Sequence, residues 1–341
     1  MKKNKKNKKH KEKYVISFIL ILMVCLGVAL GYAIQTRGGG LQGVVATILG
    51  QDAETLKDLK TVNILILGKS EDIEAELTDT IMVCSYNPKK QRAAMLSIPR
   101  DTFIGTNKNR ANGFDKLNSV YSKKGGEGVV QKIEEMTGID INYYLVVNND
   151  AVVQLVNTLG GVEFDVPIDM NYDDPTQNLH IHLKKGLQKL DGDQAEQLIR
   201  FRHNNNGTTY SSDYGDNDFG RMRTQRDFMM AVAKQTLKVQ NITKIKTIMT
   251  TIFQNIETNF ELEDIFPYVA YAVNFDTANI ASYQVAGEAK KYNNLWFFAY
   301  NKEQTSQIIM EINNYLNAVD ENTENDGNTT TDAKITIKST K

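Results

Sequence analysis

The feature that most constrains this chain of 341 residues is an uncharged apolar run near its start. Residues 14–34, YVISFILILMVCLGVALGYAI, follow a basic segment that holds eight lysines and a single acid, Glu12. At about 1.5 Å per residue, a helix of this length crosses a hydrocarbon core of about 30 Å. Small residues at Gly31 and Ala33 also fit a cleavable signal peptide, but the apolar core is longer than the usual ~7–15 residues. We therefore predict a retained transmembrane helix.

The lysines predict the orientation of this helix, because positively charged flanks stay on the cytoplasmic side. Residues 1–13 are then a basic cytoplasmic tail, and the chain after Arg37 lies outside the cell. Without the first 13 residues, 32 Lys and Arg stand against 40 Asp and Glu, a formal charge of −8. An acidic extracellular unit is not expected to bind nucleic acid or to meet cytosolic substrates. We expect a single-pass protein of the cell membrane.

The rest of the chain divides by composition. Residues 35–60 are interpreted as a juxtamembrane linker, residues 61–318 as the folded extracellular unit, and the Thr/Asn-rich residues 319–341 as a flexible tail. Short apolar or alternating runs predict strands at 62–68, 80–86, 92–98 and 143–148. Helical patterns lie at 116–123, 128–136, 150–159, 194–201, 221–239, 243–256 and 303–316. The alternation predicts an α/β protein, a three-layer α/β/α sandwich with a central mixed sheet.

The two cysteines do not indicate a disulfide framework or a catalytic thiol. Cys25 lies within the apolar run, without the small preceding residue that a lipoprotein cleavage site needs. Cys84 lies in a predicted strand, where a buried cysteine behaves as a small apolar side chain.

Residues 218–227, DFGRMRTQRD, concentrate arginine in an otherwise acidic unit. If Asp218 caps a helix that begins near residue 220, Arg221 and Gln225 fall four residues apart on one face and are free to meet a ligand. The DFG triplet is also typical of protein kinases, but the chain lacks their glycine-rich loop, lysine and HRD motifs. It also lacks a GxSxG elbow and a Walker A loop, which excludes those hydrolase and nucleotide-binding classes.

Two more arginines, Arg200 and Arg202, follow the helical pattern at 194–201. On an extended exit from that helix both side chains point the same way and can join Arg221. Surface salt bridges with nearby aspartates are the alternative, and for isolated arginines the better one. Several forked guanidinium groups at one place suit phosphate oxygens, so the cluster predicts a phosphate site.

Other charged residues stand at the ends of predicted strands. Arg100 and Asp101 follow the third strand at its carboxyl edge, where open α/β sheets bind ligands. Asp79 lies at the start of the second predicted strand. Its carboxylate either compensates the positive charge of the arginines or binds Mg²⁺ together with a phosphate. Lys116 opens a predicted helix, a position that an ordinary surface lysine also takes.

Three histidines, His180, His182 and His203, raise the question of a metal site. In a strand, His180 and His182 lie on one face. The sequence offers no third ligand and no HExxH pattern beside them, so zinc is not predicted.

Taken in order, these segments resemble the LytR-CpsA-Psr family of membrane-anchored cell-wall enzymes. The matching motifs are NILILG, TDTIMV, LSIPRDT, FDKLNSVYSKKGG, INYYLVVNNDAVVQLVNTLGGVEFDVP, KGLQKLDGDQAEQLIRFR and DFGRMRTQRDF, across residues 62–237. The resemblance implies a phosphotransferase of Gram-positive cell-wall biogenesis with Mg²⁺ as cofactor. Its substrate would be an anionic glycopolymer, a teichoic acid or capsular polysaccharide, carried on polyprenyl pyrophosphate. The acceptor would be a peptidoglycan hydroxyl.

The resemblance also implies roles for individual residues. The family's phosphate-binding arginines fall on Arg100, Arg200, Arg202 and Arg221, its lysine on Lys116, its glutamine on Gln225, and its carboxylates on Asp79, as metal ligand, and Asp218. Ser70 occupies the position of another metal-side aspartate of the family. Glu71 or Asp72 can substitute for it; otherwise metal binding is weaker.

Catalysis at such a site would involve Asp79, Arg100, Asp101, Arg202, Asp218 and Arg221. Any of the three aspartates could orient or deprotonate the attacking hydroxyl, and the sequence does not choose between them. The lipid of the carrier needs an apolar groove, for which the helical patterns at 128–136 and 150–159 are candidates, unless they are ordinary core helices. The alternative functions are a non-catalytic scaffold that binds polyprenyl-linked glycan and a polyprenyl-pyrophosphate hydrolase.

Overall fold

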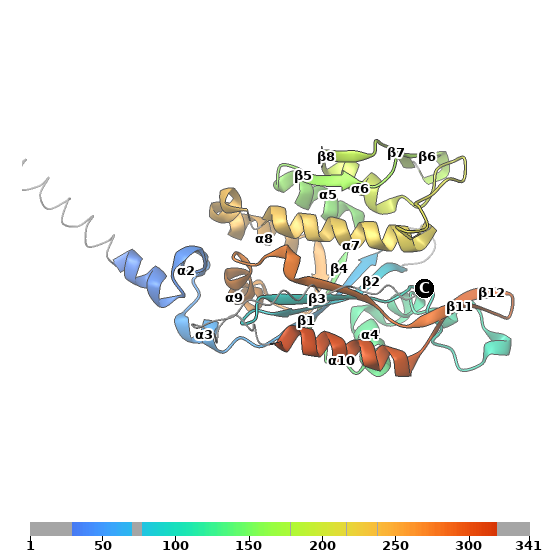
Figure 1. Ribbon diagram of the computed structural model, residues 1–341, viewed down its shortest axis with the longest axis horizontal. Helices are drawn as coiled ribbons and strands as arrows, with labels where there is room; N and C mark the ends of the chain where they lie inside the picture. The colour runs from blue at the N-terminus through green and yellow to red at the C-terminus, as the bar shows by residue number, and fades with distance from the viewer. Residues whose placement is uncertain (1–28, 70–76, 178, 216, 237, 319–341) are drawn as a thin grey trace, which may run out of the picture.

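The computed structural model describes residues 29–69, 77–177, 179–215, 217–236 and 238–318. Its centre is a six-stranded mixed sheet of order β10-β3-β2-β1-β4-β9 (Figure 1). The strands are β1 Val62–Lys69, β2 Thr78–Asn87, β3 Arg92–Ser97, β4 Tyr143–Val147, β9 Ile256–Thr258 and β10 Ile280–Gln284. β2 is antiparallel to β1 and β3, while β4 is parallel to β1 and β10 to β3. The four predicted strands and the mixed sheet are confirmed.

Helices flank this sheet, as the α/β prediction requires. α4 (Ser119–Thr137) and α10 (Lys302–Asn317) lie below it in Figure 1, and α7 (Asn217–Thr236) lies above it. On β1, Leu65 and Leu67 are fully buried in a core shared with α4 and α10. Ile64, which points to the opposite face, packs in a second core with α9 (Leu262–Ala272). The strand is therefore covered on both faces.

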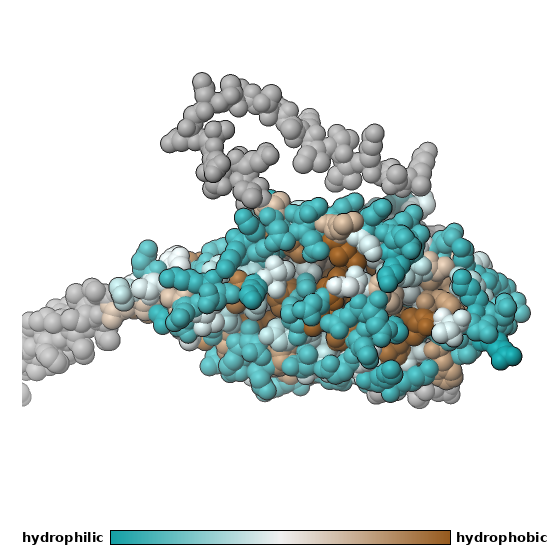
Figure 2. Space-filling view, turned by 90° about the horizontal axis from the view of Figure 1, so that it is seen from below, coloured by the Kyte–Doolittle hydropathy of each residue, from teal (hydrophilic) through white to brown (hydrophobic). Residues whose placement is uncertain are grey.

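The outer surface below the sheet is mostly hydrophilic, with smaller apolar areas between the polar side chains (Figure 2). α10 illustrates why, since Ile312 and Leu316 on its inner side are buried while most of its other positions are polar and exposed.

The two helical patterns predicted at 116–123 and 128–136 join into the single helix α4. Gly125 makes the junction, with a φ of 62° that interrupts the helical geometry and favours glycine. The helix begins at Ser119, so Lys116 precedes it and does not open it. It ends at Gly138, whose left-handed φ of 72° is a common helix stop.

A further unit, which the sequence pattern did not reveal, packs on α7. It combines α5 (Asn149–Thr158) and α6 (Gly192–Arg200) with the antiparallel pair of β5 (Val162–Val166) and β8 (Gly186–Leu190) and the hairpin of β6 (Met170–Asp174) and β7 (Leu179–Leu183). Its apolar cluster includes Phe164, Ile181 and Phe228. α7 therefore lies between the sheet and this unit (Figure 1), an addition to the predicted three layers.

Residues of the predicted linker also pack on the folded unit. α2 (Gly40–Ile48) and α3 (Ala53–Lys57) join a core with α8 (Ile245–Phe253) and α9, in which Val45 is fully buried. In the part of the chain that the structure describes, no helix has the length and apolar character needed to cross a membrane. The basic tail and most of the predicted transmembrane helix fall within residues 1–28, which lie outside the described residues. The predicted C-terminal tail at 319–341 also lies outside them.

Candidate phosphate site

The sheet topology brings Asp79 and Arg100 together. Because β2 runs antiparallel to β3, the start of β2 lies beside the end of β3. Asp79 is the second residue of β2, and Arg100 follows the proline that comes after β3. Arg100 Nη1 donates a hydrogen bond to Asp79 Oδ1. The charged residues predicted at two separate strand ends thus form one ion pair at the sheet edge.

A second charged group comes from α7 and the segment that follows α6. Arg221 Nη2 lies 2.6 Å from Asp218 Oδ1, and Arg202 Nε lies 3.6 Å from the same oxygen. Arg221 is only 6% exposed. α7 begins at Asn217, so Asp218 lies in its first turn. The prediction that Asp218 caps the helix is therefore wrong, because the side chain pairs with two arginines instead.

The two groups are electrostatically coupled. Burial lowers the Arg100 pKa, but the carboxylates of Asp79 and Asp218 outweigh it and raise that pKa above its usual value. The pKa of Arg221 is lowered, mainly by burial and further by the charges of Arg100 and Arg202. Both guanidinium groups stay protonated at physiological pH. The opposite directions reflect the deeper burial of Arg221, whose pKa the Asp218 carboxylate raises only in part.

Two buried guanidinium donors of this cluster, Arg100 Nε and Arg221 Nε, lack a hydrogen-bond partner in the described part of the chain. Arg221 Nη2 and Asp218 Oδ1 lie 2.6 Å apart as an ion pair. A buried donor left without a partner typically costs about 1–3 kcal/mol. An anion with several oxygens, such as a phosphate, would offer acceptors to these two Nε donors.

Gln225 was predicted to face a ligand, but both ends of its side chain are engaged within the protein. Its Oε1 accepts a hydrogen bond from Thr80 Oγ1 at 2.8 Å, and its Nε2 donates to the backbone oxygen of Ile199 at 2.9 Å. It therefore ties α7 to β2 and to the end of α6. Arg200, the last residue of α6, pairs with Glu196 at 2.8 Å.

Lys116 and Asp101 form a neighbouring ion pair. Lys116 Nζ donates to Asp101 Oδ1 at 2.7 Å and also lies 5.6 Å from the centre of the Phe297 ring. The backbone of Asp101 accepts a hydrogen bond from the N–H of Phe298 at 2.9 Å. The pair is thus fixed against β12 (Leu295–Tyr300), which forms a hairpin with β11 (Gly287–Tyr292).

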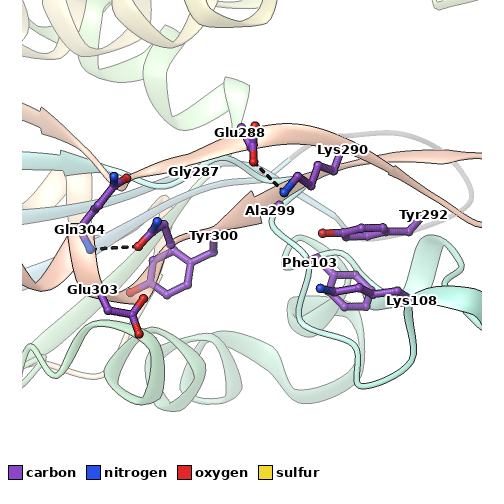
Figure 3. A pocket seen from close by; sticks show the side chains of 11 residues that line it. Phe103, Lys108, Gly287, Glu288, Lys290, Tyr292, Ala299, Tyr300, Glu303 and Gln304 are labelled. Atoms are coloured by element: carbon purple, nitrogen blue, oxygen red, sulfur yellow. Dashed lines mark hydrogen bonds and ion pairs between the residues drawn. The ribbon is translucent and has the colours of Figure 1, made fainter. Parts of the chain in front are cut away.

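A cavity of about 610 Å³ lies beside this pair, between the β11–β12 hairpin and the start of α10 (Figure 3). Its lining residues include Phe103, Lys108, Glu288, Tyr292, Tyr300 and Gln304. The Phe103 ring packs edge-on against Tyr292, with 5.0 Å between ring centres, and the Phe103 backbone bridges to Lys116. None of the clustered arginines lines this cavity. The cavity is therefore separate from the arginine cluster and is linked to the Lys116–Asp101 pair through Phe103.

Asp79 is the residue at which a magnesium ion is expected. The structure describes Asp79, the predicted metal ligand, whereas Ser70, Glu71 and Asp72 lie outside the described residues. Among the described residues, Asp79 belongs to no group of three metal-ligating side chains. Mg²⁺ is usually held by one or two carboxylates together with substrate phosphates. Asp79, placed beside a predicted phosphate site, fits such an ion.

Comparison with known proteins adds an independent line of evidence. The LytR_cpsA_psr family matches residues 44–314. Biofilm regulatory protein A of Streptococcus mutans is 27% identical over 292 residues, which cover 80% of this chain and 68% of that protein. The polyisoprenyl-teichoic acid–peptidoglycan teichoic acid transferase TagU of Halalkalibacterium halodurans is 29% identical over 74% of this chain and 79% of its own. The crystal structure of Bacillus subtilis TagV is 25% identical with a TM-score of 0.62, covering 76% of this chain and 99% of that one.

Proposed function

Because the chain belongs to the LytR_cpsA_psr family, we propose that it is a phosphotransferase of cell-wall biogenesis. It would move an anionic glycopolymer, of the teichoic acid or capsular polysaccharide type, from polyprenyl pyrophosphate to a peptidoglycan hydroxyl. Similarity to proteins named teichoic acid transferases supports this reaction class. The observation that carries the proposal is the set of buried guanidinium donors on Arg100 and Arg221 that lack partners among the described residues.

In this proposal the arginines hold the pyrophosphate. The acceptor hydroxyl attacks the phosphorus that bears the glycan, and the bond from that phosphorus to the bridging oxygen breaks. Polyprenyl phosphate leaves, and the glycan phosphate becomes a phosphodiester on the acceptor. Arg100, Arg202 and Arg221 would stabilise the charge that grows on the leaving phosphate, since their charges are already oriented before the reaction. A Mg²⁺ ion bound at Asp79 would neutralise further phosphate charge.

The proton of the attacking hydroxyl needs an acceptor, and we assign it to Asp101. Asp79 faces Arg100, and Asp218 lies between Arg221 and Arg202. The Asp101 side chain is the most exposed of the three, at 38%, and pairs with Lys116. Of the three carboxylates it is therefore the most accessible to an incoming hydroxyl.

The cavity itself would receive the peptidoglycan acceptor. Aromatic rings such as Tyr292 and Tyr300 offer flat apolar surfaces for sugar rings, while Lys108 and Glu303 offer partners for the charged groups of a peptide stem. Phe103, which lines the cavity, lies two residues after Asp101 and three after Arg100 in the chain. An acceptor held in the cavity would therefore be close to these residues.

The proposal includes the location of the protein. Residues 14–34 would span the membrane once, with residues 1–13 inside and the catalytic unit outside. The site would then stay close to a lipid carrier in the same membrane. Protease added to intact cells should remove the folded unit and spare the N-terminal segment.

The direct test uses the full chain with a labelled polyprenyl-pyrophosphate saccharide, with Mg²⁺, and with or without peptidoglycan oligomers. Saccharide phosphate joined to the oligomers, dependent on the acceptor, supports transfer. Release of polyprenyl phosphate without an acceptor indicates the hydrolase instead. Binding without either product indicates the scaffold. Asp101→Asn should keep carrier binding and lose transfer if Asp101 takes the proton.

A further inference from the structure

A group of potential metal ligands lies on the β6–β7 hairpin, outside the phosphate site. Along β7, Leu179, Ile181 and Leu183 are buried, so His180 and His182 share the exposed face, as the alternation of a strand requires. In the hairpin register Asp173 stands directly opposite His180. The third ligand that the sequence did not reveal is therefore a carboxylate on the neighbouring strand.

The three side chains converge on one point. His180 Nδ1 lies 2.6 Å and His182 Nε2 lies 3.3 Å from the same oxygen, Oδ1 of Asp173. The ligand atoms of all three residues lie within 4.8 Å of one another. A tetrahedral ion with bonds of about 2.0–2.1 Å holds its ligand atoms roughly 3.3 Å apart. Small side-chain rotations would open the cluster to that size.

Neighbouring groups orient these ligands. Nδ1 of His182 contacts the side-chain oxygen of Asn171 at 2.9 Å, and as the donor there it leaves Nε2 unprotonated for a cation. The backbone N–H of Asp173 donates to Asn205 Oδ1 at 2.7 Å, and its carbonyl accepts from Asn205 Nδ2 at 3.0 Å.

We infer that Asp173, His180 and His182 form a binding site for a divalent transition-metal ion of the zinc class. Two imidazoles with one carboxylate suit Zn²⁺, Co²⁺, Ni²⁺ and Cu²⁺ better than Mg²⁺, which prefers oxygen ligands alone. All three side chains are about half exposed, so water can complete the coordination.

Such an ion would join the two strands of the hairpin. It would also reinforce the chain that follows Arg202, because Asn204 and Asn205 in that segment bond to the backbone of β6. The inference of a metal site rests on these contacts alone and does not depend on the proposed transferase function.

The test is a titration of the full chain with Co²⁺, with a purification tag that contains no histidine and with saturating Mg²⁺ to occupy carboxylate sites. One equivalent of Co²⁺ should bind with visible absorption, and Zn²⁺ should displace it. Loss of an outer-shell group typically weakens metal binding by about 10–100-fold. Losing a direct ligand in Asp173→Ala, His180→Ala or His182→Ala should weaken it at least as much.

His203→Ala is the matched control, because His203 packs edge-on against Tyr172 of the same hairpin but is not one of the three ligands. It should bind Co²⁺ like the wild type. If a ligand variant fails to fold, protection of His180 and His182 from diethyl pyrocarbonate by Zn²⁺ in the wild type gives the same information. Equal binding by the wild type and the folded ligand variants, or the absence of protection, would overturn the inference.

Discussion

Asp218 Oδ1 lies 2.6 Å from Arg221 Nη2, and the two side chains form an ion pair in which Arg221 is almost fully buried. The carboxylate compensates part of the Arg221 charge, while Arg221 Nε has no hydrogen-bond partner among the described residues. That donor is left for another acceptor.

This relationship predicts how Asp218→Asn behaves. The change removes the counter-charge of the buried Arg221, and we expect the free energy of unfolding to fall by about 1–3 kcal/mol, less than for a fully buried pair. Inorganic pyrophosphate should stabilise the variant more than the wild type, because it supplies the missing charge. Denaturant unfolding with and without pyrophosphate measures both effects. If pyrophosphate raised the free energy of unfolding equally in the variant and the wild type, this interpretation would be contradicted.

Gln225 is predicted to act within the protein, by joining α7 to β2. Gln225→Ala and Thr80→Val should each lower the free energy of unfolding by about 1–2 kcal/mol, because each breaks the 2.8 Å hydrogen bond. In the double variant the free energy of unfolding should fall by less than the sum of the two single losses. Thr80→Val combined with Arg223→Ala is the control pair and should be additive. Additivity in the Gln225 pair would show that the hydrogen bond does not contribute.

Cys84 predicts an alkaline loss of stability. Cys84 is half-buried rather than fully buried, and desolvation in the sheet raises the pKa of its thiol to about 11. An exposed thiol in the unfolded chain titrates near about 8.5. The stabilising contribution of the neutral thiol is therefore complete below pH ~8.5 and is lost as the pH rises toward 11.

The measurement compares unfolding of the wild type and Cys84→Ala at pH 8 and 10.5. Between these pH values the free energy of unfolding of the wild type should fall by about 2 kcal/mol more than that of the variant, because the variant has no thiol to titrate. Identical pH slopes in the two proteins would mean that the thiol titrates alike in both states.

The acceptor cavity predicts a selective kinetic effect. Tyr292→Ala should raise the KM for peptidoglycan oligomers about tenfold, the equivalent of about 1.4 kcal/mol of lost contact, while carrier binding stays unchanged. Trp296 lies on the same hairpin, is 63% exposed and does not line the cavity. Trp296→Ala is therefore the control. An unchanged KM in Tyr292→Ala would place the acceptor elsewhere.

Much of the fold followed from local patterns. The strands β1 and β2 are long apolar runs, and such runs are typical of strands in a sheet that is covered on both faces. Asp79 and Arg100 could be placed at strand ends because a proline and a change to polar residues mark those ends. Their direct pairing could not, since it depends on β2 lying between β1 and β3.

The missed features depend on contacts between segments. β6 and β7 have only five residues each, and β6 is mostly polar (MNYDD), so its composition resembles that of a loop. Without that hairpin, Asp173 could not be connected with His180. Gln225 was misjudged for a related reason: spacing along α7 gave its face, but its partner Thr80 lies 145 residues away in the sequence.

The central claim is that Arg221 binds the transferred phosphate group, and the most direct test compares two arginines on the same helix. Arg223 lies two residues from Arg221, is 44% exposed in its side chain, and pairs with Asp227. With the full chain, labelled carrier and peptidoglycan oligomers, Arg221→Ala should reduce transfer at least about 100-fold. Arg221→Lys should not restore it, since an ammonium lacks the forked donors. Arg223→Ala should stay close to the wild-type rate. Transfer by folded Arg221→Ala at the rate of Arg223→Ala would contradict the account.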